Sequence, residues 1–80
     1  MSPKLPQVSG NDLIRLLMEL GYEVVRQKGS HIRLRKTTPA GEHKITVPNH
    51  KEISKGTLNE ILSDVSLWSG VSKDELIGRL

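Results

Sequence analysis

The chain has 80 residues, and its 12 Lys and Arg against 9 Asp and Glu give a formal net charge of +3. This length predicts one domain that spans residues 1–80. The absence of cysteine excludes disulfides and thiolate metal ligands. No apolar run is long enough for a membrane span, and no signal peptide precedes the first polar residues. We therefore expect a cytoplasmic protein without membrane contacts.

Residues 1–8 contain two prolines and show no periodicity, so they are predicted to form a tail. A helix is predicted from about residue 10 to about residue 20. Ser9 can cap its start while Asp12 reaches back, in a variant of the capping box. Gly21 stands where a left-handed cap ends a helix. The apolar side chains of the segment recur at helical spacing: Leu13, Ile14, Leu16, Leu17 and Leu20.

Three strands are predicted next, over about residues 22–28, 31–37 and 42–47. Gly29-Ser30 is a plausible two-residue turn between the first two strands. Thr38-Pro39-Ala40-Gly41 has the composition of the turn before the third strand, and Pro48 ends that strand. The pattern therefore predicts an antiparallel sheet.

With Gly29 and Ser30 as the turn, the first two strands have a defined register. Lys28 faces His31, Arg26 faces Arg33, and Val24 faces Arg35. These residues lie on one face, because side chains alternate along a strand with a period of two. The other face is predicted to meet the helices and carries Val25, Gln27, Ile32 and Leu34, continued by Ile45 and Val47. The exposed face is then a basic surface that contains a histidine.

A second helix is predicted over about residues 54–65, with Leu58, Ile61, Leu62 and Val65 on one face. Residues 66–80 are predicted to be a linker and a short C-terminal helix. That helix opens at Ser72, with Glu75 completing a capping box and with Val71 and Leu76 as a hydrophobic staple. The predicted fold class is α+β: a helix, a three-stranded antiparallel sheet, a helix and a short C-terminal helix.

The positive charge is concentrated between residues 26 and 36, a segment without any acidic residue. It contains Arg26, Lys28, Arg33, Arg35 and Lys36. Two interpretations are open. The segment binds a polyanion, since each phosphate contact releases counterions, or it is a solvated basic hairpin that keeps the surface soluble. Aromatic residues are scarce, which argues against single-strand binding by base stacking.

Three histidines are present, and their spacings match no zinc motif, so neither a metal site nor a cofactor is expected. His31 stands out because it follows the tight turn beside Lys28, Arg26 and Arg33. RNA carries its own nucleophile, the 2′-hydroxyl, so an enzyme needs to remove that proton, bind the phosphate and protonate the leaving oxygen. One histidine with cationic neighbours suffices for this chemistry. The alternative is an exposed hairpin histidine without a role.

Other candidates border the second helix. His50 can contact phosphate or act as the acid, or it is a loop residue without a role. Lys51 and Lys55 lie where the backbone N–H groups of a helix start attract anions. His43 shares strand parity with buried positions and is predicted to be half-buried and structural. The candidate RNA- and phosphate-binding residues are Arg26, Lys28, Ser30, Arg33, Arg35, His50, Lys51 and Lys55.

Several of these elements, at these separations, resemble the HicA (YcfA-like) toxin family. They begin with Val8-Ser9-Gly10, Leu13-Ile14 and Leu17, then Leu20-Gly21-Tyr22, followed by Val25-Arg26-Gln27-Lys28-Gly29-Ser30-His31. They continue with Ile45-Thr46-Val47-Pro48-Asn49-His50 and Lys55-Gly56-Thr57-Leu58, then Ile61-Leu62. The resemblance covers about residues 5 to 65 in order. The chain departs from the family pattern after Leu62, where residues 66–70 lengthen the link to the last helix.

The resemblance implies a double-stranded-RNA-binding-domain-like fold. It implies a toxin that cleaves mRNA without a metal, through the histidine of Gly-Ser-His, which is His31 here. It also implies a HicB-type antitoxin that binds and blocks the toxin. One rival is a non-catalytic double-stranded-RNA-binding module, which shares the basic face but does not need His31. A second rival is an interaction protein whose basic hairpin docks on an acidic partner.

Overall fold

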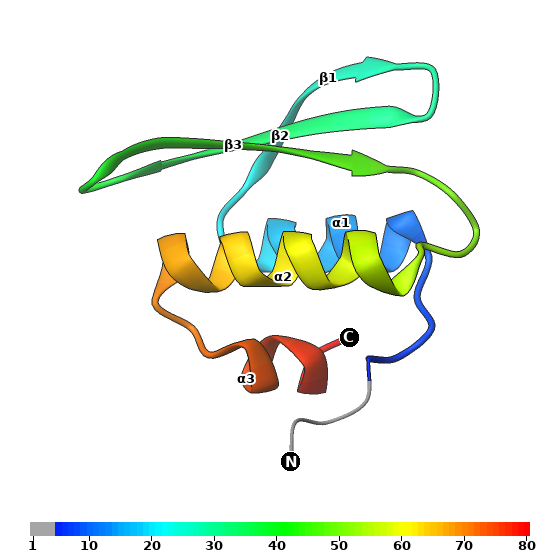
Figure 1. The fold of residues 1–80 in the computed structure, drawn as a ribbon. Coiled ribbons are helices and arrows are strands. Elements are labelled where there is room, and N and C mark those ends of the chain that lie inside the picture. The colour runs from blue at the N-terminus through cyan, green and yellow to red at the C-terminus, as the bar shows by residue number, and fades with distance from the viewer. Residues whose placement is uncertain (1–4) are drawn as a thin grey trace.

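The computed structural model describes residues 5–80, and its elements follow the predicted order. They are α1 (Gly10–Glu19), β1 (Glu23–Lys28), β2 (His31–Thr38), β3 (Gly41–Pro48), α2 (Lys55–Ser69) and α3 (Lys73–Gly78). The strands form one antiparallel sheet in the order β1-β2-β3. Figure 1 shows α1 and α2 on the same side of the sheet and α3 beyond α2. The predicted α+β layout is confirmed.

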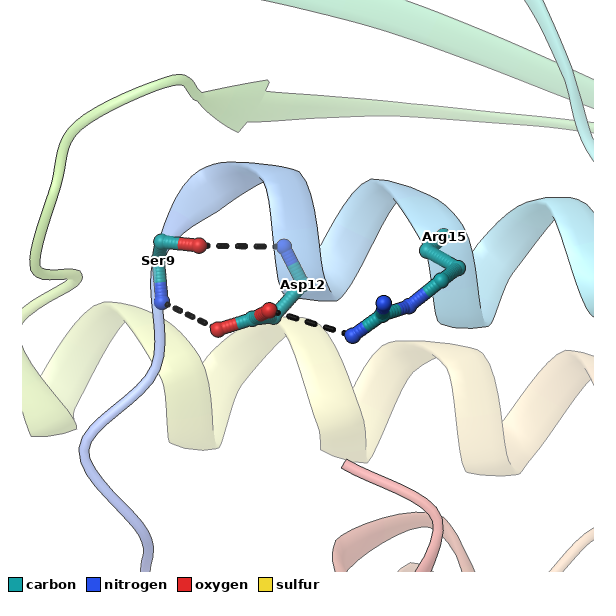
Figure 2. A network of polar contacts seen from close by, with 3 residues as sticks. All are labelled: Ser9, Asp12 and Arg15. Carbon is teal, nitrogen blue, oxygen red and sulfur yellow. Dashed lines mark hydrogen bonds and ion pairs between the residues drawn. The ribbon is translucent and has the colours of Figure 1, made fainter.

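Helix α1 begins where the capping pattern predicts. The Asp12 backbone N–H donates to the Ser9 hydroxyl at 3.1 Å, and the Ser9 backbone N–H donates to the Asp12 carboxylate at 3.0 Å (Figure 2). Two of the N–H groups that a helix start leaves unpaired are thereby satisfied. Arg15 donates to the same carboxylate at 3.1 Å. Hydrogen bonds from the Ser9 backbone and side chain, and then the Arg15 charge, lower the pKa of Asp12.

The β1–β2 register agrees with the prediction near the turn and departs from it further away. Lys28 pairs with His31 and Arg26 pairs with Arg33, as predicted. The prediction that Val24 faces Arg35 is wrong, because the register shifts between Val24 and Arg26. Val24 therefore pairs with Leu34, and Glu23 pairs with Arg35. A bulge of this kind places two residues of one strand opposite one residue of its neighbour.

The apolar face of the sheet belongs to β2 and β3. Its buried side chains are Ile32, Leu34, Ile45 and Val47, and they join the leucines of α1 and α2 in one core. Strand β1 is exposed along its whole length, and Val25 is 41% exposed. The prediction that Val25 and Gln27 meet the helices is therefore wrong. Strand β1 is an edge strand, and Figure 1 shows that its C-terminal part lies farther from α1 and α2 than β2 and β3 do.

Helix α2 is longer than predicted and ends at Gly70, which adopts a left-handed conformation with φ 74°. Residues 66–69, expected to belong to a linker, form its last turn. This turn is held because Trp68 stacks on His43, with ring centroids 4.8 Å apart and an interplanar angle of 9°. Ser72 then caps α3 and accepts from the Glu75 N–H at 3.2 Å, while Leu76 is fully buried.

A buried polar cluster lies between β3 and α2. His43 is only 4% exposed, so it is structural as predicted but more buried than expected. Its Nδ1 is 2.5 Å from the Tyr22 hydroxyl, and its Nε2 is 2.9 Å from an Asp64 carboxylate oxygen. Burial, and then the negative charge of Asp64, raise the pKa of Tyr22. Both ring nitrogens of His43 are thus paired inside the fold.

The N-terminal segment is packed where the structure begins to describe it. Val8 is 6% exposed and its carbonyl accepts from the Ile53 N–H at 2.8 Å, so this end of the predicted tail belongs to the core. Residues 1–4 of the tail lie outside the described residues. Gly10 touches the loop after β3, because a Cβ there would be 2.6 Å from the Asn49 Cα. Its N–H donates to the His50 carbonyl at 2.8 Å.

Candidate active site

A pocket of about 230 Å³ opens on the face of the sheet that points away from the helices. Its lining comes from all three strands: Arg26 and Lys28 of β1, His31 and Arg33 of β2, and Thr46 of β3. Four of these residues were candidates from the sequence. Thr46 is not among the predicted site residues, because the evident signal of the third strand is its apolar pair, Ile45 and Val47. The signal that could have found it is strand parity, since Thr46 alternates with the buried Ile45 and Val47.

Strand register arranges the lining in two rows across the sheet. Arg26, Arg33 and Thr46 are directly opposed and form one row. Lys28, His31 and Pro48 form the second row, beside the turn. Gly29 provides the turn with a φ of 59°, a left-handed conformation that other residues adopt at a cost. The tight turn therefore fixes His31 as the first residue of β2, next to Lys28.

The basic face has a neutralised half and an open half. Arg35 lies 2.8 Å from Glu23 and 3.7 Å from Glu42, and these carboxylates raise the pKa of its guanidinium. No carboxylate within 4 Å pairs with Arg26, Lys28 or Arg33 among residues 5–80. The open half coincides with the pocket. Its cations are free to bind an added anion.

His31 is exposed at the pocket and keeps its ring available. Within the described part of the chain, no side-chain hydrogen bond is made by the His31 ring, in contrast to the ring of His43. Both of its nitrogens can therefore meet a bound molecule, one as a proton acceptor and the other as a donor. An exposed imidazole beside three cations is suited to proton transfer at a bound phosphate.

The remaining candidates lie outside this pocket. Ser30 is in the turn, and its carbonyl accepts from the Asn49 N–H at 2.6 Å, which joins the turn to the loop after β3. His50 and Lys51 are exposed in that loop, and Lys55 is the exposed first residue of α2. Figure 1 shows the turn, this loop and the start of α2 at one end of the molecule. These side chains border the site without lining it.

Within residues 5–80, the structure brings together no group of three His, Cys, Asp or Glu side chains that could hold a metal ion. His43 is paired with Tyr22 and Asp64. None of the helices described between residues 5 and 80 has the length and apolar character needed to cross a membrane.

Comparison with protein families places the chain among the toxins of bacterial toxin–antitoxin systems. The matching family is described as HicA toxin of bacterial toxin-antitoxin, and its model covers residues 10–67. The match includes α1, the whole sheet and every residue of the pocket. The chain therefore belongs to the HicA toxin family, as the sequence predicted. No curated protein and no solved structure gives a significant match.

Proposed function

We propose that this toxin is an endoribonuclease that cleaves mRNA without a metal, with His31 as its catalytic residue. The observation that carries the proposal is the pocket, where the exposed imidazole lies with Arg26, Lys28 and Arg33. An enzyme that uses the 2′-hydroxyl of RNA as nucleophile needs a proton-transfer group and a phosphate site, and we assign these tasks to the imidazole and to the three cations.

In the proposed reaction the 2′-oxygen attacks the adjacent phosphorus while the bond from phosphorus to the 5′-oxygen breaks. His31 serves as general base or general acid: it removes the 2′-hydroxyl proton or protonates the leaving 5′-oxygen. The products are a 2′,3′-cyclic phosphate and a free 5′-hydroxyl. Lys28, Arg26 and Arg33 stabilise the negative charge that grows on the phosphoryl oxygens. Activity is expected to survive a chelator, because the proposal gives proton transfer to His31 and charge stabilisation to the three cations, so that no metal ion is needed for either task.

The bordering residues are proposed to contact the RNA backbone beyond the cleaved bond. Ser30, His50, Lys51 and Lys55 cluster around the turn and the loop after β3, where they can extend the basic surface past the pocket. Arg35 is assigned a weaker contact, because two carboxylates already compensate its charge. These contacts contribute affinity that depends on salt.

The partner protein is proposed to be a HicB-type antitoxin that binds the toxin and blocks cleavage. Membership of a family of toxin–antitoxin toxins supports this proposal. A non-catalytic double-stranded-RNA-binding module is the rival function, and the order of helices and strands suits it equally well. The rival needs the basic face but gives His31 no chemical task.

Induced expression in a bacterial host separates the two functions. Cells would express the wild type, His31→Ala or Arg15→Ala, a control that removes an exposed charge on α1. Growth and mRNA integrity would be followed together. We expect the wild type and Arg15→Ala to arrest growth and fragment mRNA, and His31→Ala to do neither while accumulating as folded protein. Intact mRNA with the wild type, or equal fragmentation with His31→Ala, would contradict the proposal.

A further inference from the structure

The two rows of the pocket lie two residues apart along β2. Strand geometry separates His31 and Arg33 by about 6–7 Å along the strand, with both side chains on one face. Successive phosphates of an extended ribonucleotide chain are a similar distance apart. The row of Lys28 and His31 and the row of Arg26, Arg33 and Thr46 are therefore spaced to meet neighbouring phosphates.

The row of Arg26, Arg33 and Thr46 has the composition of an anion site in its own right. Arg26 and Arg33 are directly opposed across β1 and β2, and no carboxylate of the described residues pairs with either one. Opposed like charges are unfavourable in a sheet, and a bound anion between them converts repulsion into attraction. Thr46, an exposed residue of β3 that lines the pocket, completes the row, and its hydroxyl can donate a hydrogen bond.

We infer that the pocket holds two consecutive phosphates of one RNA strand. His31 and Lys28 take the phosphate that is cleaved, and Arg26, Arg33 and Thr46 take its neighbour. This inference rests on the proposed function for the first site and adds the second. Thr46 becomes a substrate-positioning residue, and the minimal good substrate becomes a trinucleotide with two phosphates instead of a dinucleotide with one.

Binding of short 2′-O-methyl ribonucleotides tests the second site without requiring cleavage. The probes carry one, two or three phosphates, and their Kd values are measured at constant salt. For the wild type we expect about a tenfold gain from one phosphate to two, the size of a charge-assisted hydrogen bond, and a smaller gain from two to three. Arg33→Ala and Thr46→Val should reduce the first gain, whereas Lys28→Ala should weaken all three probes.

Matched controls separate the site from general charge and folding effects. Arg15→Ala removes one arginine on α1. Thr37→Val is the same change as Thr46→Val, made at an exposed position of β2 outside the pocket. Both should keep the wild-type gain. Equal gains in Arg33→Ala, Thr46→Val and the controls would overturn the second site. Circular dichroism of each variant establishes whether it is folded. If Arg33→Ala is not folded, Arg33→Gln takes its place, and Thr46→Ala likewise takes the place of Thr46→Val.

A cleavage assay links the second site to the reaction. A cut site is first mapped in a defined RNA, and a short oligonucleotide that contains it is then synthesised. A neutral methylphosphonate replaces either the phosphate on the 5′ side of the cleaved one or the phosphate on its 3′ side. One of the two replacements should slow the wild type about tenfold and slow Arg33→Ala much less, because one of the contacts to that phosphate is already lost. If each methylphosphonate slows Arg33→Ala as much as it slows the wild type, the effects of replacement and substitution on the cleavage rate are additive. That result would overturn the inference even if cleavage itself occurs. Absence of cleavage, with the two-phosphate binding gain intact, would instead overturn only the proposed function.

Discussion

Arg26 and Arg33 lie directly opposite each other on β1 and β2, and both line the pocket that contains His31. Arg35 follows Arg33 by two residues on β2, farther from the Gly29-Ser30 turn. It faces Glu23 and also pairs with Glu42. Two arginines of β2 therefore differ: carboxylates compensate the charge of Arg35, whereas no carboxylate of the described residues pairs with Arg33. The uncompensated pair lowers the stability of the free protein and favours binding of an anion.

The first prediction concerns this pair in the absence of RNA. Arg33→Gln should keep or raise the free energy of unfolding at low salt, because it removes a repulsion of up to about 1 kcal/mol. Arg35→Gln should lower it modestly, because it removes two exposed ion pairs. Urea titration of both variants and the wild type measures the difference. A larger loss of stability for Arg33→Gln than for Arg35→Gln would show that Arg33 is held by favourable contacts.

The second prediction concerns the salt dependence of RNA binding. Each phosphate contact with a single strand contributes about 0.7 to the slope of log K against log salt concentration. Arg33→Ala should lower the slope by about that amount, while Arg35→Ala should lower it less, because its charge is compensated. Lys44→Ala, an exposed cation of β3 paired with Glu42, is the control. Equal slopes for Arg33→Ala and Lys44→Ala would mean that RNA binds elsewhere.

The third prediction concerns the buried cluster around His43. Tyr22→Phe removes the hydroxyl that pairs with Nδ1 and leaves a buried polar atom unsatisfied, at a cost of about 1–3 kcal/mol. Lys44→Ala, next to His43 but exposed, should cost less than about 0.5 kcal/mol. RNA cleavage per folded molecule should not change, because Tyr22 does not line the pocket. Urea unfolding and cleavage assays measure the two effects, and an unchanged midpoint for Tyr22→Phe would contradict this account of His43.

The fourth prediction concerns acid and the start of α1. In the folded protein, hydrogen bonds from Ser9, and then the Arg15 charge, hold the pKa of Asp12 below its ordinary value of 3.8. A carboxylate with a lowered pKa stabilises the fold at pH values above the unfolded pKa and loses this effect as pH falls through the folded pKa. Asp12→Ala should therefore destabilise the protein at neutral pH, and the difference from wild type should shrink below pH 3.8. Unfolding midpoints that differ equally at neutral and acidic pH would contradict it.

The sequence predicts the elements and the centre of the site because local signals specify them. The Ser9–Asp12 capping box, the Gly29-Ser30 turn and period-two alternation lead directly to α1, the hairpin and the pairing of Lys28 with His31. The bulge near Val25 has no such signal, because a register shift depends on the fit of two strands to the core. Sequence periodicity also cannot reveal that β1 is exposed along its whole length instead of packing on the helices.

Long-range contacts account for the other differences. The last turn of α2 is held by stacking of Trp68 on His43, which are far apart in the sequence. The carboxylates that compensate Arg35 come from both neighbouring strands, so the compensation of its charge emerges only from the strand pairing. Thr46 joins the site through its pairing with Arg33 across β2 and β3. In each case, three-dimensional neighbours decide what a residue contributes.

Product analysis with matched substrates tests the central claim, the chemistry of His31, most directly. One oligonucleotide carries ribose at the mapped cut site, and its twin carries 2′-deoxyribose there. Wild-type protein should cut the first to a 2′,3′-cyclic phosphate and a free 5′-hydroxyl and should leave the second intact. His31→Ala should bind the ribose substrate nearly as well but cut it about 10²- to 10⁴-fold more slowly, the typical loss when a general acid or base is removed. A 5′-phosphate product, or cleavage of the 2′-deoxy twin, would show that water is the nucleophile and would contradict the role assigned to His31.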